Sequence, residues 1–224
     1  MSVGRKGYKY LFIIFFMALI SKAKGRGENE TPSGYERLFG NRQLGMLMSK
    51  VQSAVISMGN ELEVMIANEI KDTKGISIQK INKENRVFKG IKDGHDIIID
   101  CVIEKEGKIR LIEIKDGDTF DTKKVAGEVA SLITAKAHLI KSHNLKEEDV
   151  SLHYCSFNAT SHEQIERGAK GLLPKNSAMT GKEFCKLVGL DFDKIVQERK
   201  KDQKENLDYF ISELKKIPEI HSKF

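Results

Sequence analysis

Four ionisable residues interrupt two apolar stretches near the middle of the chain. Asp96 and Asp100 stand in the first stretch, and Glu113 and Lys115 stand in the second. A charge within a half-buried strand costs free energy unless a partner or a bound cation compensates it. Carboxylate oxygens suit a hard divalent cation, and such a cation can activate water for hydrolysis. The pattern predicts a hydrolytic metal site or, as the simpler alternative, two amphipathic strands with their charges in solvent.

The spacing of these residues predicts a β-hairpin that brings two acids together. Residues 97–104 form one strand, "KEGK" forms the turn, and residues 109–115 form the next strand. With the turn centred within "EG", residues whose numbers sum to 213 face each other, so that Asp100 lies opposite Glu113. Directly opposed side chains, and side chains two positions apart, share one face of a sheet.

This register also assigns the remaining charged residues to a face. Ile98 falls opposite Lys115, and Asp96, Asp100, Glu113 and Lys115 are all expected on the same side of the sheet. Two opposed carboxylates with Cβ atoms roughly 5 Å apart repel each other. Lys115 can supply part of the missing positive charge, and a divalent cation held by oxygen ligands would supply more.

Longer patterns predict the elements that carry the hairpin. Apolar residues recur at helical spacing in residues 42–70 and again in residues 122–141, where Asp121 or Thr122 is the expected N-cap. An alternating strand follows at 150–157, then a short helix capped by Thr180, and a charged helix at 193–216. Two strands joined by a helical crossover pair in parallel, so we expect an α/β fold with a mixed β-sheet flanked by helices.

The domain organisation follows from composition along the chain. Basic residues and an apolar run from Tyr10 to Ile20 precede a polar linker, so residues 1–33 are predicted to be a signal-like leader and linker. A membrane-associated start, a buried helix and an upstream extension are the alternatives. Residues 34–224 are expected to form a single domain, with a core at about 42–160 and a helical C-terminal part at about 178–217.

Composition narrows the class of partner. The 224 residues carry a formal charge of +6, which favours a polyanionic partner such as nucleic acid.

The three cysteines are widely spaced and form no CxxC pair, which indicates reduced thiols in a cytoplasmic protein rather than a zinc site or disulfides.

Several motifs resemble those of a known group of nucleases. An aspartate followed after 13 residues by Glu-Ile-Lys, as in Asp100 and Glu113–Lys115, resembles the PD-(D/E)xK superfamily. "GNELE", "IEIKDGDTFDTKK" and "MTGKEFCKLVGLD" are similar to stretches of type II restriction endonucleases, and the resemblance covers residues 40–195. His95 departs from the pattern, because it stands where the superfamily has its proline. The resemblance implies a restriction-endonuclease-like core.

The resemblance also implies roles for individual residues. Asp100 and Glu113, together with the Ile114 carbonyl, would hold one or two Mg²⁺ ions, while Lys115 would position water or stabilise charge on the phosphate. Asp96 is a second candidate for the aspartate. Glu63, in "GNELE", could add an acid from the first helix or be a surface charge.

The function expected from the resemblance is magnesium-dependent, site-specific cleavage of double-stranded DNA by a cytoplasmic homodimer. A structure-specific or repair nuclease of the same fold, such as a junction resolvase, is the main alternative. A non-catalytic DNA-binding relative and an exported nuclease are two others, and the intact Glu-x-Lys argues against the first of these two.

Overall fold

The computed structural model describes residues 19–27, 30–71, 86–105, 107–117 and 120–222. Most of the predicted leader therefore lies outside the described residues, as does most of the segment before the first strand. Contacts divide the chain into two compact units, one formed by the residues up to Met58 with Asp193–Phe224, and the other by Gly59–Phe192. Each unit is described by itself.

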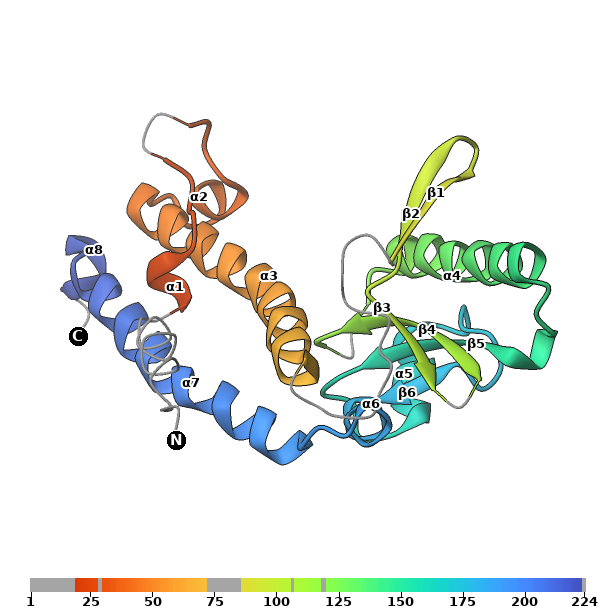
Figure 1. The fold of residues 1–224 in the computed structure, drawn as a ribbon. Helices are drawn as coiled ribbons and strands as arrows, with labels where there is room; N and C mark the ends of the chain where they lie inside the picture. Colours follow the sequence, from red (N-terminus) through yellow and green to blue (C-terminus); the bar gives the residue numbers. More distant parts are fainter. Residues whose placement is uncertain (1–18, 28–29, 72–85, 106, 118–119, 223–224) are drawn as a thin grey trace, which may run out of the picture. The chain divides into compact units, whose positions relative to one another are not determined.

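The elements follow one another in an order that alternates helices and strands after an all-helical start (Figure 1). The helices are α1 (Leu19–Lys22), α2 (Gly34–Phe39), α3 (Arg42–Lys71), α4 (Thr122–His143), α5 (His162–Gly168), α6 (Gly181–Val188), α7 (Phe192–Lys215) and α8 (Pro218–His221). The strands are β1 (Val87–Lys92), β2 (His95–Ile98), β3 (Cys101–Lys105), β4 (Lys108–Lys115), β5 (Val150–Ser156) and β6 (Ala178–Thr180).

A four-stranded mixed sheet forms the centre of the Gly59–Phe192 unit, with strand order β3-β4-β5-β6. Strands β3 and β4 are antiparallel, and Cys101 pairs with Ile112, which confirms the predicted register with residue numbers summing to 213. Strand β5 lies parallel to β4 across the α4 crossover, as predicted, and β6 lies parallel to β5. The coarse prediction of a mixed sheet flanked by helices is therefore confirmed.

The predicted strand at residues 97–104 is wrong as a single element. Strand β2 ends at Ile98 and pairs with β1 in a separate two-stranded sheet, and β3 starts at Cys101. Ile98 lies opposite Val87, so its predicted pairing with Lys115 is also wrong. The physical reason is that β1 takes up the hydrogen bonds of β2, and the Ile99 amide still donates to the Arg86 carbonyl at 3.0 Å.

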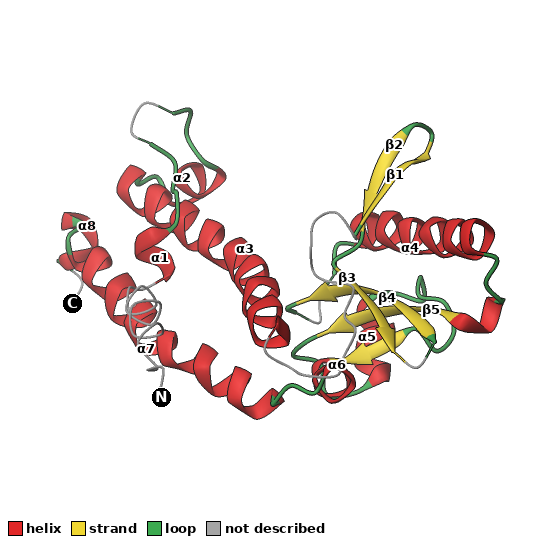
Figure 2. Cartoon of the chain, in the orientation of Figure 1, coloured by secondary structure: helices red, strands yellow, loops and turns green. Residues whose placement is uncertain are grey.

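Helix α4 covers one face of the mixed sheet (Figure 2). The Asp121 side chain caps its start by accepting from the Lys123 amide, and Asn144 ends it in a left-handed conformation. Its inward stripe is fully or nearly buried and packs against apolar residues of the strands; this stripe consists of Val125, Val129 and Leu132. Burial of this stripe fixes the helix above β4 and β5.

Helix α6 lies on the opposite face of the sheet, beside β5 and β6. Thr180 caps this helix, as predicted, and forms a capping box with Glu183, while Gly189 ends the helix in a left-handed conformation. The buried thiol of Cys155 interacts electrostatically with Cys185 of α6 and with Cys101, and all three cysteines are free. Strands β1 and β6 and helices α2, α5 and α8 were not predicted.

The second unit is helical and contains the long C-terminal helix predicted from its charge pattern. In this unit α3 and α7 are joined by a hydrogen bond of 2.8 Å between Lys50 Nζ and the Tyr209 hydroxyl. Asn206 of α7 accepts from the Ile20 amide of α1 at 3.0 Å. Within the described part of the chain, no helix combines the length and apolar character that crossing a membrane requires.

Candidate active site

Asp100 and Glu113 are brought side by side at one end of the β3–β4 pair. Asp100 directly precedes β3, and its Oδ2 accepts a hydrogen bond of 2.8 Å from the Ile114 amide. The register that pairs Cys101 with Ile112 continues to place Asp100 opposite Glu113. The amide of Ile114 thus fixes one carboxylate next to the other, which the spacing of the two residues predicts.

Lys115 lies between two carboxylates from different elements. Its Nζ is 2.7 Å from Glu113 Oε1 on the same strand and 2.8 Å from Glu128 Oε1 on α4. Lys115 and Glu113 share a face because they are two positions apart on β4. Glu128 reaches the same face because α4 packs above it. The close approach of Lys115 and Glu113 matches the predicted arrangement.

Tyr154 completes this cluster from the neighbouring strand. It pairs with Glu113 in the parallel register of β4 and β5, and its hydroxyl donates to Glu128 Oε2 at 3.0 Å. The ring is buried and packs edge-on against Phe120, with ring centroids 5.2 Å apart. Burial and then the Glu128 charge raise the pKa of the Tyr154 phenol, so the hydroxyl remains a hydrogen-bond donor at neutral pH.

The electrostatics of the cluster are dominated by its negative charge. Burial, and next the charge of Asp100, raise the pKa of Glu113 to about 8, and the neighbouring Lys115 opposes this shift without cancelling it. Burial by itself would lower the pKa of Lys115. The interactions with Glu113 and, after it, Glu128 have the larger combined effect and raise this pKa. The carboxylates therefore favour an additional cation, and the lysine keeps its charge.

Glu63 and Arg86 lie at the border of the cluster. Arg86 donates to the Asp100 carbonyl oxygen at 2.8 Å and is 3.9 Å from the Glu63 carboxylate. Burial and then the charge of Asp100 raise the pKa of Glu63. Glu63 is thus near enough to feel the charge of Asp100, as expected if "GNELE" contributes an acid to the site.

The structure separates Asp96 from the other candidates. Asp96 lies in β2, is exposed, and its Oδ1 accepts a hydrogen bond of 2.9 Å from the Gly90 amide of β1. Its predicted position on the face of Glu113 is therefore wrong, because β2 belongs to the two-stranded sheet. Of the two candidate aspartates, the structure brings only Asp100 to Glu113 and Lys115.

Glu128 and Tyr154 were missed by sequence reasoning. A signal for Glu128 was present, since it lies three residues after Val125 and four before Leu132, on the stripe that α4 turns toward the sheet. A charged residue on such a stripe indicates a partner beneath the helix. The sequence carried no comparable signal for Tyr154, because its neighbour on β4 depends on the parallel register.

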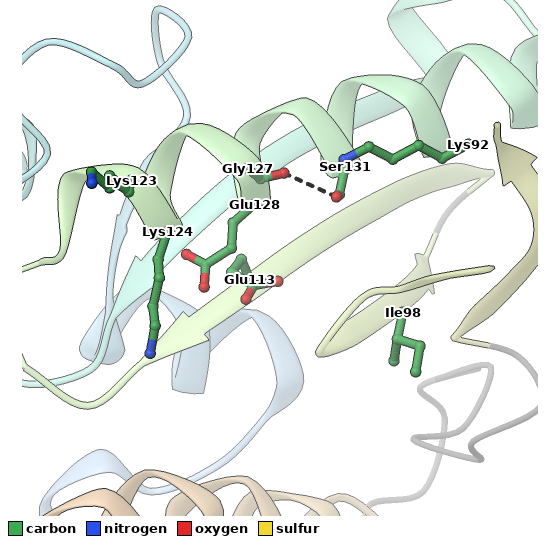
Figure 3. Close-up of a pocket in the computed structure, with 8 residues that line it drawn as sticks. All are labelled: Lys92, Ile98, Glu113, Lys123, Lys124, Gly127, Glu128 and Ser131. Carbon is green, nitrogen blue, oxygen red and sulfur yellow. Dashed lines mark hydrogen bonds between the residues drawn. The ribbon is translucent and has the colours of Figure 1, made fainter. Parts of the chain in front are cut away.

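An open pocket of about 500 Å³ lies above Glu113 and Glu128. Figure 3 shows Glu128 extending from α4 toward Glu113 on β4, with the two carboxylates near each other. Three lysines line the same pocket: Lys123 and Lys124 from the first turn of α4, and Lys92 from β1. The pocket is therefore lined by both carboxylates and ammonium groups.

The donor set can be compared with the needs of a divalent metal ion. Among the described residues, no group of three or more His, Cys, Asp or Glu side chains is arranged to hold a metal. Mg²⁺ does not need such a group, because it usually keeps several waters and binds one or two carboxylates together with substrate phosphates. Asp100 and Glu113 are an oxygen-donor pair of this kind, and burial first and the charge of Asp100 second raise the pKa of Glu113.

Comparison with known proteins places this chain in a family. A relative described as the type II restriction enzyme HhaII of Haemophilus parahaemolyticus is 36% identical over 228 aligned residues, which span 91% of this chain and 96% of that enzyme. The chain belongs to the type II restriction enzymes. Membership makes it an endodeoxyribonuclease that hydrolyses phosphodiester bonds in DNA, as the sequence predicted. No protein-family model matches the sequence, and no solved structure matches it.

As a restriction enzyme, the protein needs a place where a phosphodiester can meet a nucleophile. In the cluster of Asp100, Glu113 and Lys115, a buried carboxylate that lines an open pocket contacts an ammonium group and lies beside a second, half-buried carboxylate. Type II restriction enzymes generally use divalent metal ions, in keeping with an oxygen-donor pair beside a lysine.

Proposed function

We propose that this restriction enzyme cuts double-stranded DNA at specific sites in a Mg²⁺-dependent reaction at the Asp100–Glu113–Lys115 cluster. The observation that carries the proposal is the 2.7 Å contact of Lys115 with Glu113, next to an Asp100 anchored on the Ile114 amide. We further propose that the Gly59–Phe192 unit has the restriction-endonuclease-like core of the PD-(D/E)xK superfamily. The prediction of one nuclease domain over residues 34–224 stays a prediction.

Asp100, Glu113 and the Ile114 carbonyl would hold the metal ion. Asp100 Oδ2 is occupied by the Ile114 amide, so Oδ1 is the oxygen that would serve as a ligand. Glu63 would add charge from α3, and its raised pKa indicates that it would also gain from a nearby cation. When bound, a divalent ion supplies a water of lowered pKa and polarises the scissile phosphate.

Lys115 would act as a fixed positive charge rather than as a base. Its carboxylate partners raise its pKa, so it stays an ammonium at neutral pH and cannot accept a proton from water. An ammonium can donate hydrogen bonds to an attacking water and to a non-bridging phosphate oxygen, where negative charge grows during in-line attack. The products expected are a 5′-phosphate and a 3′-hydroxyl.

The pocket lysines would guide the DNA backbone onto this cluster. Lys123 and Lys124 are exposed at the start of α4, and Lys92 is exposed at the end of β1. Ammonium groups at these positions can neutralise phosphates beside the scissile one, with an affinity that falls as salt rises. The formal charge of +6 on the chain acts in the same direction.

We also propose that the enzyme acts as a homodimer in the cytoplasm. Two-fold DNA sites are commonly read by two-fold proteins. Support comes from the helical unit, where several large apolar side chains are exposed, among them Val55, Ile56, Leu207 and Ile211. Where such side chains form one contiguous patch, they are typical of a surface that a partner covers.

Cleavage of DNA by purified variants tests the proposal. Plasmid DNA incubated with the protein and Mg²⁺ should give discrete fragments, and Glu113→Gln and Lys115→Ala should each reduce cleavage at least about 100-fold. Glu147→Gln is the matched control, because Glu147 also contacts a lysine of α4, at 2.5 Å, but lies away from the cluster. Fragments that persist in EDTA, or full activity in both cluster variants, would refute the assignment. Cleavage restricted to branched DNA would indicate a structure-specific nuclease instead.

A further inference from the structure

Glu128 uses both carboxylate oxygens to join two neighbouring elements. Its Oε1 is 2.8 Å from Lys115 Nζ on β4, and its Oε2 accepts from the Tyr154 hydroxyl on β5 at 3.0 Å. The side chain is three-quarters buried, and the backbone that carries it is held by the buried Val125 and Val129. Figure 3 shows Glu128 extending from α4 toward the strand that bears Glu113.

The other carboxylate that contacts Lys115 belongs to Glu113, and metal binding would change this contact. Glu113 Oε1 is 2.7 Å from Lys115 Nζ, and Glu113 is also a proposed metal ligand. A divalent cation on this carboxylate would repel the ammonium and compete for the same oxygens. A lysine that depended on Glu113 alone would then lose its position at the moment when the reaction needs it.

We propose that Glu128, fixed by the Tyr154 hydroxyl, is the positioning residue that keeps Lys115 in place when Glu113 binds the metal. This inference rests on the proposed function. Glu128 is not assigned as a metal ligand, because hydrogen-bond donors occupy both of its oxygens. Tyr154 is suited to its role because its ring is buried and held edge-on by Phe120, which leaves the hydroxyl one direction in which to donate.

Two variants of the full-length protein separate this role from a merely structural one. Glu128→Gln keeps the shape but removes the charge that holds Lys115, and Tyr154→Phe removes the hydroxyl alone. We expect Glu128→Gln to slow single-turnover cleavage of plasmid DNA about 10- to 100-fold and Tyr154→Phe to slow it less. Binding of double-stranded DNA in EDTA should stay within about twofold of wild type for both variants, because neither residue would contact the backbone phosphates. Glu147→Gln, which removes a carboxylate from Lys136 of α4 rather than from Lys115, should match wild type.

A direct measurement on Lys115 provides a readout besides activity. Reductive methylation followed by peptide mass spectrometry reports how freely each lysine amine reacts, with the other lysines as internal references. In wild type, Lys115 should stay protected with and without Mg²⁺. In Glu128→Gln it should become several-fold more reactive, and the increase should be larger with Mg²⁺ present, when Glu113 would be engaged by the ion.

The outcomes distinguish the inference from the proposed function. Wild-type cleavage and continued protection of Lys115 in Glu128→Gln would overturn the positioning role while Glu113→Gln and Lys115→Ala remain inactive. Calorimetric titration with Mg²⁺ showing that Glu128→Gln loses as much affinity as Glu113→Gln would make Glu128 a ligand and would also overturn it. Normal cleavage by Glu113→Gln and Lys115→Ala would instead refute the proposed function itself.

Discussion

Replacement of Glu113 by Gln should stabilise the metal-free protein at alkaline pH while removing its activity. In the folded protein, burial and the neighbouring Asp100 raise the pKa of Glu113 from an ordinary 4.5 to about 8. Between these two values the folded chain holds a proton that the unfolded chain has released. The stability of wild type therefore falls as pH rises through this range, because stability decreases wherever the folded state binds more protons. Gln has no proton to lose, so the stability of the variant should not fall in this way as pH rises.

The size of the effect follows from the same two pKa values. The difference between 4.5 and about 8, at roughly 1.4 kcal/mol for each pKa unit, sets an upper bound of about 5 kcal/mol. Gln also gives up the charged contact with Lys115, although the lysine keeps Glu128 at 2.8 Å. We therefore expect Glu113→Gln to be more stable than wild type by about 1 to 3 kcal/mol at pH 9, and nearly equal to it below pH 5.

Urea unfolding in EDTA, followed by far-UV circular dichroism because the chain contains no Trp, measures this difference. Curves at pH 5 and pH 9 give the pH dependence, and Glu147→Gln, whose side chain is 78% exposed in wild type, should follow wild type at both. Mg²⁺ should stabilise wild type more than Glu113→Gln, because a ligand that binds the folded state stabilises it. A variant less stable than wild type at pH 9, or a difference of equal size at both pH values, would show that burial does not penalise the Glu113 charge.

Three further predictions concern other parts of the Gly59–Phe192 unit. Replacing Lys123 and Lys124 together by Ala should weaken binding of double-stranded DNA and lower the slope of log K against log salt by about 1 to 2, measured by fluorescence anisotropy; an unchanged slope would exclude phosphate contacts. Thr180→Ala should lower the free energy of unfolding by about 1 kcal/mol in urea titrations, because α6 loses its N-cap, and Thr180→Ser should restore it. Gly181→Ala should destabilise by about 1 to 3 kcal/mol, because a Cβ there would overlap the backbone at the end of β5. Gly59→Ala, which has open space around it, should not.

Much of the fold could be predicted from local patterns. The register that pairs Cys101 with Ile112 followed from the turn and from the alternation of side chains along the strands. Helix α4 followed from its apolar period, and the start of α6 from its cap, Thr180. These features depend on residues close in sequence, whose spacing fixes the geometry before any distant contact forms.

The break between β2 and β3 could not be predicted in the same way. Residues 97–104 have the composition of one continuous strand, and only the presence of β1 shows that β2 pairs elsewhere. A strand's pattern tells which side chains share a face, but it does not tell which other strand supplies the hydrogen bonds. For this reason Asp96 stayed a second candidate beside Asp100 in sequence, although the two residues lie in different parts of the fold.

The sequence by itself determined the chemical groups of this protein: an aspartate and a Glu-x-Lys triplet at a spacing that opposes the acids across a hairpin. The tertiary structure decided which aspartate lies beside Glu113 and Lys115, and it placed Glu128 against Lys115 and the Tyr154 hydroxyl against Glu128. Glu128 comes from the crossover helix α4 and Tyr154 from the parallel strand β5. Both lie beside β4 only because α4 packs on the sheet and β5 pairs with β4. Contacts of this kind depend on packing between elements distant in the chain, which no local spacing encodes.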